Sequence, residues 1–273
     1  MNFLQSTIES KLREYTDFYI WGSESEEDLT PAKIYLQVPY GGGNNDTAGS
    51  KLTPDQLKSF AIQRSDEKNI TIITSHKNQI QDALDSGWED GFNKPYNGVF
   101  CNLCGVDCSG LVLYVINEAF GHDNAILKFF HDKADNPRTT VDGFYDYGVA
   151  ADFLNNASMS WNTKKTQVKD MLPGDIIRFG SEHVGIVYKI EEYNGKYYVS
   201  YGHSHGTYGP GLGSVTCDSK YDTLKDGTWY DSNNTYGSSY GEAILKPIYE
   251  YVVRMDLDSI MDYVNTHNIT MTE

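Results

Sequence analysis

Cys108, at the start of an apolar helix, is the residue of this sequence best suited to covalent chemistry. After it, Leu111, Val112, Val115 and Ala119 follow at helical spacing, which predicts an amphipathic helix with the cysteine at its buried edge. The unpaired N–H groups and the positive dipole end at a helix N-terminus favour an anion, so they lower the thiol pKa. The position predicts a nucleophile, although a lone cysteine there is more often a small core residue.

His183 is the candidate general base. It begins a predicted strand that places Gly185 on the same face as His183 and the even-numbered residues as far as Ile190 on the other. A glycine at 185 is expected to let the Cys108 helix pack closely. A histidine beside a cysteine at a helix N-terminus can take the thiol proton and later return it to a leaving amine. Alone, His183 is more often an interface histidine, so the hypothesis depends on the pair.

His203 is the candidate for the group that orients the base. Asn194-Gly195 is a strong hairpin signal, and the returning strand ends just before His203. The hairpin places this residue beside the start of the His183 strand, where it can fix the first imidazole. His205 and Ser200 are weaker candidates, and a loop histidine without a role remains the alternative.

The charge of the chain excludes some classes of partner. Its 273 residues include 38 acidic and 22 basic ones, for a net charge of −16. This balance argues against nucleic-acid binding and against adsorption to an anionic bilayer. No apolar run approaches the ~20 residues that a membrane helix needs, and no membrane insertion is expected.

The first residues give an expectation about localisation. Residues 1–11 contain Glu9 and lack a basic start before an apolar core, which predicts no secretory signal peptide. We therefore expect a chain that stays in the cytoplasm until it is released, is exported by another route or is phage-encoded, or whose signal has been removed.

The four cysteines raise the possibility of a metal or a cluster. Cys101, Cys104 and Cys108 resemble part of an iron–sulfur run, and Cys217 would complete four ligands. No second CxxC pair exists, however, and Cys217 lies far along the chain in a Gly/Ser/Asp-rich segment. We therefore expect no metal and no cofactor. Cys101 and Cys104 are either a strained local disulfide or two free thiols.

The chain divides into two predicted parts. Residues 1–89 are expected to be a mainly helical, structural or substrate-positioning extension, with a docking helix over 2–15 and further helices over 53–64 and 75–87. Residues 90–273 are expected to be the domain that carries the site, with insertions at 122–170 and 203–246. The predicted strands over 176–179, 183–190 and 196–201 of this α+β domain form an antiparallel meander. A last strand over 248–255 and a closing helix follow.

Three blocks of the sequence resemble the signatures of the NlpC-type cell-wall cysteine peptidases, in order and in local sequence. They are Asp107-Cys108-Ser109-Gly110-Leu111-Val112, Leu172-Pro173-Gly174-Asp175-Ile176-Ile177 and His183-Val184-Gly185-Ile186-Val187. Tyr96, the segment Pro137-Arg138-Thr139 and Arg254 also resemble residues of that family. The resemblance covers roughly residues 90–255 and leaves the first ninety outside.

The resemblance implies a papain-like α+β fold, with an antiparallel sheet packed on the nucleophile helix. It implies hydrolysis of amide bonds in peptidoglycan stem peptides at the bacterial cell wall, without a metal. Carried over, Cys108 attacks the scissile carbonyl, His183 is the base and His203 orients it. Tyr96 and the helix start at Ser109 would hold the oxyanion or the substrate.

Other functions remain open on the same fold, because fold does not fix function. An acyltransferase, a deamidase or a protein-directed peptidase would use the same cysteine and histidine. A wall-binding or virion module would use neither. The two insertions at 122–170 and 203–246 are expected to cover the cleft and narrow the substrate range.

Overall fold

The structure, a computed structural model, describes residues 3–16, 19–23, 31–35, 106, 108–120, 124–133, 138–139, 145–146, 154–179, 183–205, 209–231 and 251–269. The helices are α1 (Phe3–Thr16), α5 (Cys108–Phe120), α6 (Ala125–Lys133) and α9 (Leu257–His267), with 3₁₀ turns η2 (Val168–Asp170) and η3 (Leu224–Asp226). The strands are β1 (Tyr19–Ser23), β2 (Pro31–Tyr35), β3 (Arg138–Thr139), β4 (Tyr145–Asp146), β5 (Asn162–Lys165), β6 (Ile176–Phe179), β7 (His183–Tyr193), β8 (Lys196–His205), β9 (Gly209–Cys217), β10 (Thr228–Asp231) and β11 (Val252–Met255). The helices expected over 53–64 and 75–87 lie outside the described residues.

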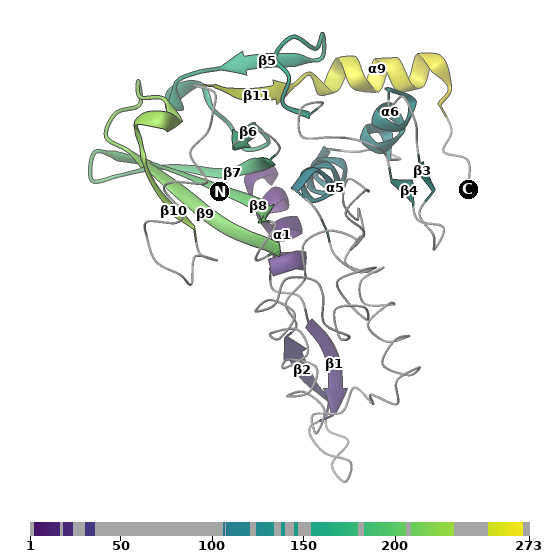
Figure 1. Cartoon of the computed structure of the whole chain (residues 1–273), viewed down its shortest axis with the longest axis horizontal. Coiled ribbons are helices and arrows are strands. Elements are labelled where there is room, and N and C mark those ends of the chain that lie inside the picture. Colours follow the sequence, from purple (N-terminus) through teal and green to yellow (C-terminus); the bar gives the residue numbers. More distant parts are fainter. Residues whose placement is uncertain are drawn as a thin grey trace.

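A seven-stranded antiparallel sheet is the main element of the described fold (Figure 1). Its strand order is β10-β9-β8-β7-β6-β11-β5, and two separate pairs, β1-β2 and β3-β4, complete the described strands. Asn194 and Gly195, both with positive φ (51° and 74°), make the tight turn between β7 and β8. The α+β class and the antiparallel meander expected from the sequence are therefore confirmed.

Both ranges that were predicted as insertions contribute strands to this sheet. Within 122–170, β5 pairs with β11 at one edge of the sheet. Within 203–246, β9 pairs with β8 over the whole length from Tyr197↔Cys217 to His205↔Gly209, and β10 pairs with β9 at the other edge. Local sequence does not predict the strand over 209–217, because this segment is rich in glycine, a residue with low strand propensity.

The first hydrophobic core lies between the sheet and the helices. α5 packs against β7 and β8, and α1 packs against α5, β7 and β9 (Figure 1). The core includes Ile8 and Leu12 of α1, Leu111 of α5 and Val184 of β7, all fully buried. The docking helix predicted over 2–15 is thus confirmed. Although it falls within the range predicted as an extension, it shares its core with the helix that starts at Cys108.

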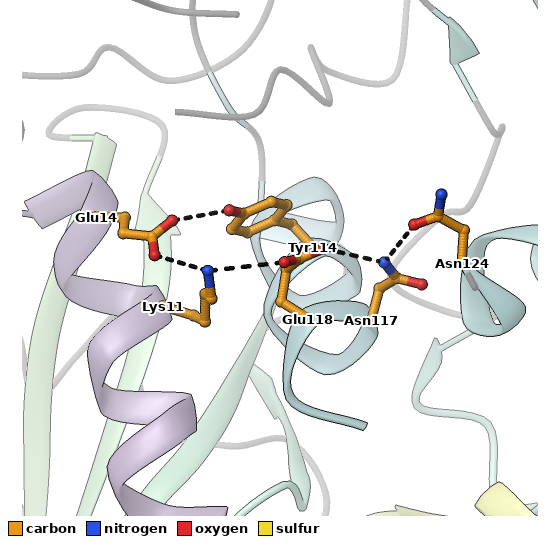
Figure 2. Close-up of polar contacts among 6 residues, drawn as sticks. All are labelled: Lys11, Glu14, Tyr114, Asn117, Glu118 and Asn124. Atoms are coloured by element: carbon orange, nitrogen blue, oxygen red, sulfur yellow. Dashed lines mark hydrogen bonds and ion pairs between the residues drawn. The ribbon is translucent and has the colours of Figure 1, made fainter. Parts of the chain in front are cut away.

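Polar contacts also join α1 to α5 and α5 to the start of α6. Tyr114 Oη donates to Glu14 Oε2 at 2.8 Å, and Lys11 Nζ contacts Glu14 Oε1 at 2.8 Å and Glu118 Oε2 at 3.6 Å. Figure 2 shows how this chain of contacts continues through Asn117, whose Nδ2 donates to Asn124 Oδ1 at 3.1 Å. These contacts fix α5 against its neighbouring helices.

The second core lies on the opposite face of the sheet, which is strongly curled. Trp229 of β10 and Phe179 of β6 lie with ring centroids 5.6 Å apart, although three strands separate β10 from β6 in the sheet order. In a flat sheet these strands would be about 19 Å apart, at ~4.8 Å per strand. The curl therefore encloses a partly barrel-like core that includes Ile177, Val199 and Tyr201.

A β-bulge in β7 changes the expected alternation of its side chains. Up to the bulge, Val187 pairs with Tyr201, but Lys189 pairs with Ser200, so Tyr188 has no residue opposite it on β8. The extra residue shifts the faces of the residues that follow. Ile190 consequently packs against the second core, and the prediction that it shares a face with Val184 is wrong.

The role expected for Gly185 is also wrong, since the nearest atoms belong to the sheet and not to the cysteine helix. A Cβ at Gly185 would lie 2.8 Å from Phe179 Cε2, 2.9 Å from the Gly202 carbonyl oxygen and 3.2 Å from His203 Cβ. Close approach of a helix to a strand occurs instead at Gly202 of β8, where a Cβ would overlap the side chain of Leu12. The reason is that Gly185 faces the second core, whereas the helices cover the other face.

The substitution Gly202→Ala is expected to destabilise the protein by about 1–3 kcal/mol, the usual cost of overpacking. Leu12 is fully buried and cannot move away from the added methyl group. Urea unfolding of Gly202→Ala, Leu12→Ala and the double variant measures the effect. The two costs should be clearly less than additive, because the new methyl group enters the space that Leu12 leaves. Strict additivity would contradict this contact.

Candidate active site

The cysteine helix begins as predicted. Cys108 is the first residue of α5 and is 3% exposed, and Ser109 beside it is also buried. The fully buried side chains of Leu111, Val112 and Val115 anchor the helix in the first core. This holds the thiol at the N-terminus of a packed helix, where the backbone N–H groups favour an anion.

His183 and His203 are in direct contact. His183 Nε2 lies 2.8 Å from His203 Nδ1, with His183 partly exposed and His203 completely buried. When His183 Nε2–H donates to His203 Nδ1, the other ring nitrogen of His183 is left as the basic one. A proton taken up there forms an imidazolium whose Nε2–H still has its acceptor. The contact therefore suits His183 as a base and His203 as the group that orients it.

Aromatic rings surround the two histidines on the face of the second core. Phe179 lies with its ring centroid 5.4 Å from that of His183 and 5.8 Å from that of His203. Tyr201 lies 5.6 Å from His203 and 5.4 Å from Trp229. These contacts leave the imidazoles little freedom to turn. Gly185, paired with His203, leaves space for the Phe179 ring and for the Cβ of His203.

The cysteine helix and the histidine pair lie at the same end of the sheet. His183 is the first residue of β7 and His203 is close to the end of the antiparallel strand β8. Val106, which precedes the Cys108 helix, accepts a hydrogen bond at its carbonyl from Ser204 Oγ of β8 at 2.6 Å. The Cys108 helix packs in the first core, whereas the two imidazoles contact Phe179 of the second core.

The weaker candidates are placed differently. Ser200 pairs with Lys189, six residues along β7 from His183, or about 20 Å at ~3.3 Å per residue. His205 ends β8 opposite Gly209, at the same end of the sheet as His183. Tyr96, Cys101 and Cys104 lie outside the described residues. Cys217 is buried in the second core, and burial raises the pKa of its thiol to about 12, so it is not a thiolate near neutral pH.

An ion pair between the buried Asp175 and the partly exposed Arg254 holds the strand before His183. Arg254 of β11 donates from Nε to Asp175 Oδ1 at 2.7 Å and from Nη2 to Asp175 Oδ2 at 2.9 Å, and the Leu172 N–H adds a third bond at 2.8 Å. Burial raises the pKa of the Asp175 carboxyl, and the bonds from Arg254 and Leu172 act against this rise. Asp175 and Arg254, 79 positions apart in the sequence, thus fasten β6 to β11.

Sequence reasoning assigns no role to Ser204 or Phe179, which contact the site. Phe179 reads only as an apolar strand residue, and Ser204 only as part of a His-Ser-His run. Neither position carries a local signal, because each acquires its role from a partner distant in sequence, such as Val106 for Ser204.

Among the described residues, no three His, Cys, Asp or Glu side chains gather in a way that would hold a metal ion. No helix in the same part of the chain is both long and apolar enough to cross a membrane. Comparison of the chain with protein-family models, curated proteins and solved structures gives no match.

Proposed function

We propose that this protein is a cysteine peptidase that hydrolyses amide bonds in peptidoglycan stem peptides, with a papain-like arrangement of helix and sheet. The observation that carries the proposal is the 2.8 Å contact between His183 and His203, at the end of the sheet where the Cys108 helix is tied to β8. The resemblance of the sequence blocks around Cys108, Asp175 and His183 supports the choice of substrate.

In the proposed mechanism, His183 takes the proton of Cys108 and the thiolate attacks the scissile carbonyl carbon. Backbone N–H groups at the start of α5, among them that of Ser109, stabilise the negative oxygen of the tetrahedral intermediate, and Tyr96 assists. The His183 imidazolium then gives its proton to the leaving amine as the C–N bond breaks. Water, deprotonated by His183, hydrolyses the thioester and frees Cys108. Throughout, His203 accepts the hydrogen bond from His183 Nε2.

The balance of charge is compatible with this substrate class. A chain with a net charge of −16 repels polyanions such as nucleic acid, whereas a stem peptide with a diamino acid offers an ammonium group. Because peptidoglycan forms the bacterial cell wall, the proposal includes that the protein acts there.

Digestion of purified sacculi and of synthetic stem peptides tests the function. The wild-type protein is expected to release free amino groups, and Cys108→Ala to lower the rate by about 10³-fold or more, since no other group replaces the nucleophile. Cys217→Ala is the matched control, because it removes a buried thiol of the second core. Equal activity of the wild type and Cys108→Ala would sink the proposal. Transfer of the acyl group to an added amine, or release of ammonia, would redirect it to an acyltransferase or a deamidase.

A further inference from the structure

Ser204 connects two parts of the candidate site that are far apart in sequence. Its side chain is completely buried, and its Oγ donates to the carbonyl oxygen of Val106 at 2.6 Å across 98 positions of sequence. Val106 is itself buried and precedes Cys108 by two residues. The hydroxyl of Ser204 therefore holds the chain immediately before the cysteine helix.

The residue before Ser204 on β8 is His203, which contacts His183. His203 and Ser204 are consecutive residues of β8, so their side chains point to opposite faces of the sheet. His203 contacts His183 on the face of the second core, and Ser204 contacts Val106 on the face where α5 packs. One short piece of strand thus fixes both the histidine pair and the start of the nucleophile helix.

We propose that Ser204 is a positioning residue, which sets the place of the Cys108 thiol relative to His183. The inference rests on the proposed function for its catalytic consequence, but the spatial relation that it describes is independent of substrate. Proton transfer between the two side chains needs a hydrogen-bonded geometry, and a displacement of about 1 Å can lower a rate by roughly 10²-fold. The hydroxyl donates to the Val106 carbonyl, so it acts on the Cys108 helix through the backbone of Val106.

The test compares Ser204→Ala with Ser204→Thr, which keeps the hydroxyl, and with Ser214→Ala as matched control. Ser214 lies on the neighbouring strand β9, opposite Ser200 and away from Val106. Two readouts are measured on folded protein: kcat and KM for a stem peptide, and the rate of alkylation of Cys108 by iodoacetamide against pH. We expect Ser204→Ala to lower kcat by about 10- to 100-fold with little change in KM. The pH profile of Cys108 alkylation in Ser204→Ala should move to higher pH. Ser204→Thr should recover most of the wild-type kcat and most of the wild-type alkylation profile. Ser214→Ala should match the wild type in both measurements.

A kcat for Ser204→Ala within twofold of the wild-type value would overturn the proposal. So would a loss of kcat that only follows the fraction of unfolded protein in circular dichroism, with the alkylation profile of Cys108 unchanged. If the wild type cleaves no stem peptide, the proposed function fails. The alkylation comparison then still decides the role of Ser204, because it requires no substrate.

Discussion

His183→Ala is expected to lower kcat for stem-peptide cleavage by about 10²- to 10⁴-fold, the range that a general base contributes. The physical reason is that in the proposed mechanism this imidazole takes the thiol proton, while its Nε2 contacts His203 Nδ1 at 2.8 Å. Without it, the proposed mechanism has no base for the thiol proton of Cys108 and no proton donor for the leaving amine. KM is expected to change much less, because the side chain acts in the transition state more than in binding.

Alkylation of Cys108 by iodoacetamide near neutral pH provides a second measurement, which is independent of substrate. It should slow in His183→Ala. In His203→Ala it should slow to a smaller extent, because the base remains but loses the partner that orients it. His267→Ala is the matched control, since His267 lies on α9, where its Nδ1 contacts the Tyr263 carbonyl at 2.9 Å. Unchanged alkylation of Cys108 in His183→Ala would rule out His183 as the base.

Arg254→Met is expected to destabilise the protein by about 3 kcal/mol at neutral pH, the lower end of the cost of breaking a buried ion pair. Asp175 is completely buried, and its carboxylate would lose two hydrogen bonds from the guanidinium, at 2.7 and 2.9 Å. The methionine chain fills much of the same volume, so most of the loss reflects the unpaired charge. The effect should appear in the free energy of unfolding in urea.

The destabilisation caused by Arg254→Met should increase as pH rises. Burial already raises the pKa of Asp175 in the folded state, so the folded protein binds this proton more readily than the unfolded chain does. The contribution of this group to stability is therefore full below its ordinary pKa and declines as pH rises through the raised value. Removing Arg254 should raise that pKa further, because the guanidinium stabilises the charged form. The cost of Arg254→Met should accordingly be smaller near pH 5 than at pH 7.

The double variant Arg254→Met, Asp175→Asn separates charge from packing. Without a carboxylate to bury, it should recover part of the stability at pH 7 and lose the additional dependence on pH. If Arg254→Met destabilises the protein equally at pH 5 and pH 7, and equally in the Asp175→Asn background, the ion pair is not the cause of the effect.

The elements of the site were accessible from local sequence patterns. The helix at Cys108 follows from apolar residues at helical spacing, and the strands that begin at Ile176 and His183 follow from β-branched runs between turns. Asn194-Gly195 indicates the hairpin, and the hairpin places His203 near the start of the His183 strand. The nearness of the two histidines is thus a consequence of one turn and of antiparallel pairing.

The sequence by itself determined which residues begin the Cys108 helix and the His183 strand, because helix starts and tight turns depend on neighbours within a few residues. The tertiary structure decided what covers them. It curls the sheet so that the ring centroids of Trp229 and Phe179 lie 5.6 Å apart. It also places Gly185 against the second core and Gly202 against the side chain of Leu12. It also binds Ser204 to Val106. Each of these contacts joins segments distant in sequence, and its formation depends on the packing of whole elements, which no local pattern encodes.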